Sequence, residues 1–321
     1  MAVELANRAE VALDPARQQS ACEYARIRRR LLLVDIAVSV AYMLLWLLTG
    51  LSVGLRQAVS NVTGNEWLMV AGYGIVFGGI YGLVNLPLAY YSGFVLPHRY
   101  GLGTQTLGSW LTDQVKGAAL AAVIGGLAVE LVYFGLRAVP TNWWLWATAG
   151  YLIFTVVLAN LAPTLLLPLF FKLTPLDNPD LAARLERLAA QAGAKVRGVY
   201  RMDLSRRTRA ANAMVTGLGN THRIVLGDTL LNEFTPDEIE TVMAHELGHY
   251  VYRDMWSGVL VSTVVALVGF YLASLALAMG ASAFGLYGVS DVAGLPLLGL
   301  IAIGFGLLTM PLLNGFSRWV E

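Results

Sequence analysis

Six long apolar runs most constrain what this chain of 321 residues can fold into. They lie at about 31–54, 67–91, 117–139, 144–171, 256–281 and 293–316. A helix crosses a bilayer core with about 20 apolar residues, and irregular backbone cannot face lipid. Helices of soluble proteins average only ~11–12 residues, which argues against buried helices of a soluble enzyme. The runs predict a polytopic α-helical membrane protein with six transmembrane helices.

Composition supports this interpretation and excludes several classes of protein. Hydrophobic residues make up 57% of the chain and charged residues 13%, about half the density of a soluble domain. The net charge of +1 provides no basic field, so we expect no nucleic-acid partner. Because Cys22 is the one cysteine, an intrachain disulfide and a multi-cysteine metal site are excluded.

The distribution of arginine predicts orientation. Arg26 and Arg28–Arg30 directly precede the first apolar run, and basic residues favour the cytoplasmic side. We expect both termini to be cytoplasmic, in a bacterial inner membrane or an endoplasmic reticulum membrane. The expected segments are a cytoplasmic N-terminal segment (1–30), four transmembrane helices (31–172) with a cytoplasmic loop (93–116), a polar cytoplasmic domain (173–255), two transmembrane helices (256–316) and a short final segment (317–321).

The polar domain has readable local signals. Residues 197–203, 210–216 and 223–226 are typical of short strands, and 181–192 follow a helix cap at Asn178-Pro179. Thr235-Pro236, with Glu238 three residues after the threonine, is a capping box that predicts a helix to about Tyr252. We therefore expect a small α+β domain.

That last helix contains the motif His245-Glu-Leu-Gly-His249. Positions i and i+4 lie about 40° apart on a helix, so both imidazoles can reach one Zn²⁺ ion. Glu246 lies about 100° round the helix, where it is expected to act as general base and then acid, passing a proton from the attacking water to the leaving amine. The composition gives roughly 0.002 such matches by chance. The motif predicts a zinc metalloendopeptidase.

A catalytic zinc ion needs a third protein ligand. Asp254 is too near on the same helix and is expected to orient an imidazole instead. Asp291 belongs to the far side of the membrane in this topology. Glu321 returns to the cytoplasmic side and is the expected third ligand.

With these features the chain resembles the type I CAAX prenyl proteases, which are integral-membrane zinc endopeptidases of the gluzincin kind. The zinc helix with Asp254 carries part of the likeness. The rest lies in three further segments, at 91–101 with 105–108, at 212–219 followed by 223–231, and at 314–321. The resemblance implies that Asn212 and Ala213 hold a substrate backbone along an exposed strand edge, and that the spans enclose a large chamber with zinc at its cytoplasmic end.

The resemblance also implies differences and partners. The family has seven spans where six are found here, and its oxyanion-stabilising histidine and arginine would follow Glu321, so we expect a C-terminally truncated form. Peptide or protein substrates, prenylated or membrane-associated, and membrane lipid are the expected partners. The alternatives are a heat-shock-type quality-control protease, a catalytically silent zinc-binding scaffold, and a transporter, although no inverted repeat supports the last.

Two other groups of polar residues stay open. Asp35, Asn85, Glu130 and Asn160 lie within apolar runs, where polar side chains are functional candidates by default. Arg206, Arg207 and Arg209 form a basic cluster that suits anionic lipid headgroups or an ordinary solvated loop.

Overall fold

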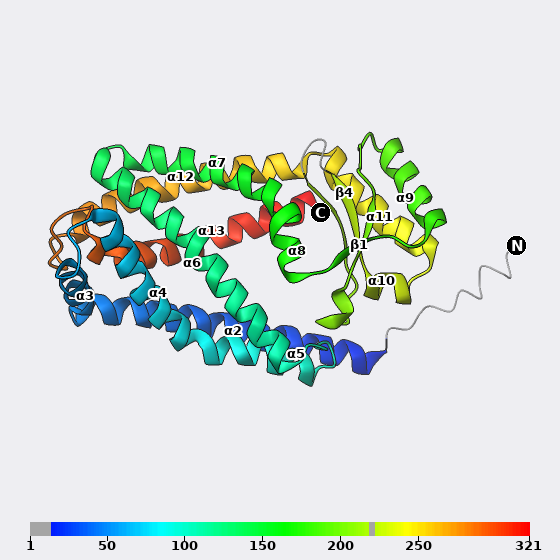
Figure 1. Cartoon of the computed structure of the whole chain (residues 1–321), viewed down its shortest axis with the longest axis horizontal. Helices are drawn as coiled ribbons and strands as arrows, with labels where there is room; N and C mark the ends of the chain where they lie inside the picture. Colours follow the sequence, from blue (N-terminus) through cyan, green and yellow to red (C-terminus); the bar gives the residue numbers. More distant parts are fainter. Residues whose placement is uncertain (1–13, 218–221) are drawn as a thin grey trace, which may run out of the picture.

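The computed structural model describes residues 14–217 and 222–321. Six long apolar helices form an elongated bundle, and a small α/β domain lies at one end of it (Figure 1). All six predicted spans are confirmed by length and composition in the described residues. The helices are α2 (Pro15–Leu48), α4 (Glu66–Tyr90), α6 (Leu107–Ala138), α7 (Trp143–Leu161), α12 (Asp254–Gly280) and α13 (Leu295–Val320).

The first span has other limits than expected. Helix α2 begins at Pro15, where the Asp14 side chain accepts a hydrogen bond from the Ala16 backbone N–H. Residues 15–30 are rich in good helix formers, so the helix continues beyond the apolar run. It ends at Leu48 rather than 54, because Gly50 takes a left-handed conformation and opens the short helix α3 (Leu51–Ser60).

Two spans continue through wide π-helical turns at the end that bears the domain. Helix α4 passes through η1 (Tyr91–Val95) into α5 (Leu96–Arg99), and α7 passes through η2 (Ala162–Leu166) into α8 (Leu167–Phe170). Prolines next to these turns remove backbone donors and favour such irregularities. The expected loop 93–116 is therefore helical up to Arg99 and again from Leu107.

The opposite end of the bundle is closed by buried polar contacts. Arg56 of α3 pairs with Asp291, and its guanidinium lies 3.7 Å from the centre of the Tyr287 ring. The Ser52 hydroxyl donates to the Ala293 carbonyl at 2.6 Å, which joins α3 to η5 (Val292–Gly294). The apolar side chains buried between spans gather at this same end, among them Tyr42, Trp46, Tyr73, Phe77, Tyr133, Leu136, Trp143 and Leu277.

The small domain is a four-stranded sheet with helices on one face. In the sheet order, β1 (Leu173–Pro175), β2 (Val199–Met202), β4 (Arg223–Gly227) and β3 (Ala213–Thr216) lie side by side. Strands β2 and β4 are parallel, and the other two pairs are antiparallel. Three of the strands were predicted, whereas β1 was not. The helices are α9 (Pro179–Gln191), α10 (Asp228–Glu233) and α11 (Pro236–Val251), with a short 3₁₀ turn η3 (Leu204–Arg206).

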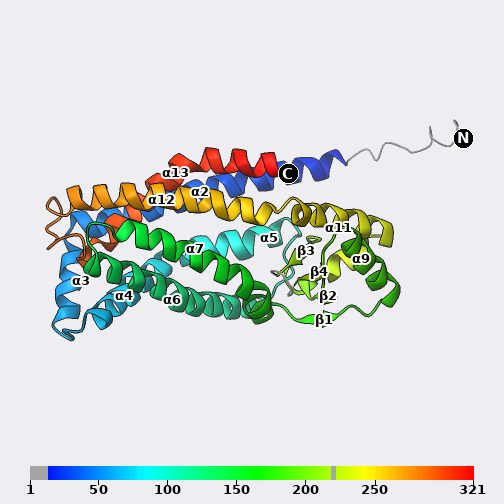
Figure 2. The ribbon, with the colours of Figure 1, turned by 90° about the horizontal axis from the view of Figure 1, so that it is seen from above.

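The two faces of the sheet have different partners. Ile224 and Leu226 of β4 pack with Leu185 of α9 and Met243 of α11. Val225, on the opposite face, packs in a cluster with Phe171, which directly follows α8. Successive residues of a strand alternate between faces. The sheet therefore lies between its own helices and the membrane bundle, as the view from above shows (Figure 2).

Candidate metal centre

Helix α11 is positioned by its cap and by one apolar face. The Glu238 backbone N–H donates to the Thr235 hydroxyl, and the Thr235 backbone N–H donates to the Glu238 carboxylate at 2.8 Å. The hydrogen bonds that the Thr235 backbone N–H and hydroxyl donate to its carboxylate hold the pKa of Glu238 below its usual value. Ile239, Met243 and Leu247, spaced four residues apart, are buried against the sheet and α9. The predicted capping box and helix are confirmed.

The two motif histidines lie together on another face of α11. The centres of their rings are 4.9 Å apart, with the planes at 76°. His245 is exposed, while Glu246 and His249 are half-buried. The i, i+4 spacing thus brings two imidazoles to one place, with the Glu246 carboxyl one residue along the helix.

Asp254 contacts His249, as expected, but it does so from the next helix along the chain. Helix α11 ends at Val251, Arg253 takes a left-handed conformation (φ 57°), and Asp254 is the first residue of the membrane helix α12. Its Oδ2 lies 2.7 Å from Nδ1 of His249. A carboxylate only accepts, so Nδ1 carries the hydrogen and Nε2 of the neutral ring keeps a lone pair for a metal. The expectation that Asp254 lies on the same helix as the motif is wrong.

The third expected ligand is not brought to the histidines. Across residues 14–217 and 222–321, no group of three His, Cys, Asp or Glu side chains is close enough to hold an ion. Glu321 follows the last turn of α13, which ends at the same end of the bundle as the small α/β domain (Figures 1 and 2). The donors that are present, two imidazoles with one oriented by a carboxylate, suit a borderline-soft divalent ion. Glu321 stays a prediction.

The strand expected to hold substrate lies at an edge of the sheet. Among the described strands, β3 pairs with β4 alone, with Met214 opposite Val225, and it lies against α11. Asn212, directly before it, is exposed, and its carbonyl accepts a hydrogen bond from Gly227 N–H at 2.8 Å. The Ala213 side chain is buried. Leu218 and Gly219, which the resemblance includes in this segment, lie outside the described residues.

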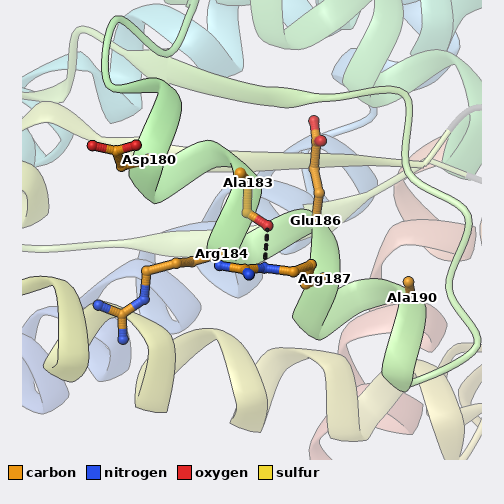
Figure 3. A pocket seen from close by; sticks show the side chains of 6 residues that line it. All are labelled: Asp180, Ala183, Arg184, Glu186, Arg187 and Ala190. Carbon is orange, nitrogen blue, oxygen red and sulfur yellow. Dashed lines mark hydrogen bonds between the residues drawn. The ribbon is translucent and has the colours of Figure 1, made fainter.

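A surface hollow of about 560 Å³ lies on the outer side of α9, and none of the expected site residues lines it (Figure 3). Among its lining residues, Arg187 Nε donates to the Ala183 carbonyl at 3.2 Å. Arg184 extends toward α11, where it pairs with Asp237 at 2.7 Å and with Glu240. Arg184 therefore links α9 to the motif helix, and the hollow does not form part of the metal centre.

Arg207 and Asp113 connect the small domain to the bundle, and the sequence did not predict either as part of the site. Arg207 forms a two-pronged ion pair with Asp113 of α6, so it is not part of a solvated loop. In the sequence Asp113 lies in the expected loop 93–116, four residues before the third apolar run, and no local signal marks it as a partner of Arg207.

Two family models match almost the whole sequence. The model described as CAAX prenyl protease N-terminal, five membrane helices, matches residues 4–172. The model of peptidase family M48 matches residues 175–321. The boundary between them falls beside the start of β1.

Three individual proteins show how far the similarity extends. The uncharacterized metalloprotease YhfN of Bacillus subtilis is 31% identical over 313 residues, which is 96% of this chain and 73% of that protein. CAAX prenyl protease 1 of Saccharomyces cerevisiae is 40% identical over 170 residues, which is 52% of this chain but 37% of the yeast protein. The crystal structure of S. mikatae Ste24p has a TM-score of 0.80 at 25% identity and covers 94% of this chain and 74% of its own.

Proposed function

Since the chain belongs to peptidase family M48 and is a multi-pass membrane metalloprotease, we propose that it is a zinc endopeptidase acting on peptide bonds near the cytoplasmic membrane face. The observation that carries the proposal is the pair of adjacent histidines, His245 and His249, with Nδ1 of His249 held by Asp254. With the hydrogen of His249 on Nδ1, its Nε2 atom keeps a lone pair that can bind a metal ion.

Each residue has a distinct role in the proposed chemistry. His245 and His249 hold the zinc ion, and Glu321 is the proposed third ligand. When bound, zinc acts as a Lewis acid that polarises a peptide carbonyl and makes water acidic enough to attack near neutral pH. Glu246 accepts the proton of the attacking water and donates it to the departing amine. Asp254 keeps His249 in the tautomer that can bind.

The substrate is proposed to bind as an added strand. An edge strand offers backbone N–H and C=O groups that pair with an extended peptide. Asn212 and Ala213 are at the start of β3, which lies against the motif helix. A peptide paired there would pass beside the histidines, so these two residues are the proposed backbone clamp.

The proposed substrate class is the prenylated or otherwise membrane-associated C-terminus of a protein. Support comes from relatives named CAAX prenyl protease in two yeasts, 40% and 34% identical over about half of this chain. A quality-control protease acting on damaged membrane proteins is not favoured by these matches. The arginines that precede the first apolar run support a cytoplasmic location of both termini.

Zinc content and peptide cleavage by the purified 321-residue chain test the proposal. Glu246→Gln should retain zinc and lose about 10²–10⁴-fold in kcat for a quenched fluorescent peptide. Glu186→Gln, on the exposed face of α9, is the matched control and should behave as wild type. Equal cleavage by Glu246→Gln would refute the assignment of the general base.

Two further comparisons use the same assay. Glu321→Ala should weaken zinc binding, and an unchanged affinity would remove Glu321 from the ligand set. A farnesylated peptide cleaved no faster than its unprenylated counterpart would end the proposed substrate class. A wild-type chain that binds zinc but cleaves neither peptide would favour a silent scaffold.

A further inference from the structure

The peptidase domain is fastened to the bundle by a joint that we call the clasp, formed by residues 102–113 and 203–209. Its centre is a two-pronged ion pair. Nε of Arg207 donates to one carboxylate oxygen of Asp113 and Nη2 donates to the other, each at 2.9 Å. Both side chains are only 18% exposed. A paired, planar arrangement of this kind is the strongest form of an arginine–carboxylate contact.

Other groups fix the planes of the two side chains. The guanidinium carbon of Arg207 lies 4.6 Å from the centre of the Phe171 ring, at the end of the fourth span. Nε2 of Gln105 donates to Asp113 at 2.5 Å. Arg207 is therefore held between an aromatic face and a carboxylate, a site that lysine would not fill equally well.

The backbone of the same segment pairs across the joint. Arg209 N–H donates to the Leu102 carbonyl at 3.0 Å, and Thr104 N–H donates to the Arg207 carbonyl at 3.1 Å. Gly103 and Thr208 form an isolated antiparallel bridge between these two bonds. The backbone around Arg207 thus pairs, over a few residues, with a loop of the membrane bundle.

The clasp leads directly into the proposed substrate strand. Five residues after Arg207 comes Asn212, and on the way the Ala210 carbonyl accepts a hydrogen bond from Thr229 Oγ1 at 3.0 Å. Gly227 allows a close approach here, because a Cβ at that position would lie 3.1 Å from the Asn212 carbonyl oxygen. The segment 207–212 is therefore held by the bundle at one end and by the sheet at the other.

One side of this segment borders open space. A cavity of about 460 Å³ is lined by Arg207, Thr208 and Ala210 together with Tyr24 and Arg28 of α2. Packing on that side does not hold the segment in place. The ion pair and its backbone bonds must therefore supply much of the restraint.

We propose that Asp113 and Arg207 are a positioning pair that sets where the substrate strand β3 lies beside the motif helix, and so tunes affinity for an extended peptide. This inference rests on the proposed function. Neither residue touches the histidines in the contacts described, so their effect passes through residues 208–212. A charge on a membrane helix would thereby control the fit of a peptide on the soluble domain.

The test is a double-mutant cycle on the 321-residue chain with Asp113→Asn, Arg207→Gln and both together. Each single variant should raise KM for the quenched peptide about tenfold with kcat within about twofold. The double variant should be no worse than either single one, because the pair is already broken. Arg206→Gln is the matched control, since Arg206 is exposed and pairs with Asp203 of its own segment, at 3.1 Å, rather than with the bundle.

Two readouts independent of cleavage separate this proposal from a purely structural role. Amide hydrogen exchange of residues 213–216 should become faster in the single variants and not in Arg206→Gln, while zinc content stays constant. A loss of maximal rate at unchanged KM, or additive effects in the cycle, would overturn the proposal. If the wild-type chain cleaves no peptide, the proposed function fails, and unchanged exchange at 213–216 would then overturn the positioning pair separately.

Discussion

Removing the carboxylate of Asp254 tests how far the metal site depends on a membrane helix. The side chain accepts one hydrogen bond, from Nδ1 of His249 at 2.7 Å. Hydrogen bonds to a charged group contribute about 1.5–3 kcal/mol, and losing such a partner of a metal-bound histidine typically costs about 10–100-fold in affinity. The His249 side chain is 33% exposed, and water screens the interaction, so the lower end of that range applies.

We therefore expect Asp254→Ala to weaken zinc binding about tenfold, which is about 1.4 kcal/mol. Asp254→Asn keeps an acceptor oxygen without the charge and should lose about threefold, since neutral hydrogen bonds are roughly half as strong. The dissociation constant of zinc is measured on the purified chain by competition with a chromophoric chelator.

Asp180→Ala, which removes an exposed aspartate in the first turn of α9, is the control and should leave zinc affinity unchanged. Thermal unfolding of the metal-free protein shows whether the loss of an acidic group from the first turn of α12 weakens the fold itself. Zinc affinity within twofold of wild type in both Asp254 variants would refute the argument that this carboxylate selects the tautomer of His249.

Two further predictions concern the stability of the domain. Burial alone would raise the pKa of Asp228, but hydrogen bonds from the Ser205 hydroxyl and backbone and from the Thr229 backbone outweigh it and lower the pKa. A lowered pKa adds stability that is present above the unfolded value of about 3.9 and is lost as pH falls through the folded value. The midpoint of thermal unfolding should therefore fall steeply below about pH 4, and Asp228→Asn should flatten that dependence; a variant with an unchanged profile would contradict this. Thr235→Ala removes the cap of α11 and should cost about 0.5–2 kcal/mol in thermal unfolding, whereas Thr241→Ala, in the middle of the same helix, should cost nothing; equal losses would argue against the cap.

Local signals in the sequence were sufficient for the spans and the motif helix. Hydropathy identifies the six long helices because lipid exposure requires apolar residues all round. The cap at Thr235 and the spacing of His245 and His249 depend on neighbours within a turn or two, so they can be recognised without tertiary structure.

Contacts between distant residues could not be recognised in this way. Strand β1 has three residues, and its pairing with β2 depends on the fold around it. Asp113 and Arg207 are 94 residues apart, so no local pattern relates them. His222 is buried with its ring 4.9 Å from that of Tyr250, a contact across 28 residues that no local pattern indicates.

Only Tyr252 and Arg253 separate the motif helix α11 from the membrane span α12. Asp254 belongs to α12, whereas the imidazole that it restrains belongs to α11. A span tilts to match the thickness of its bilayer, and any such tilt would change the geometry of this one hydrogen bond. Zinc affinity would then depend on the thickness of the bilayer. Zinc retention compared across vesicles of increasing acyl-chain length would reveal this dependence. Constant retention would show that α11 and α12 tilt together as one rigid unit.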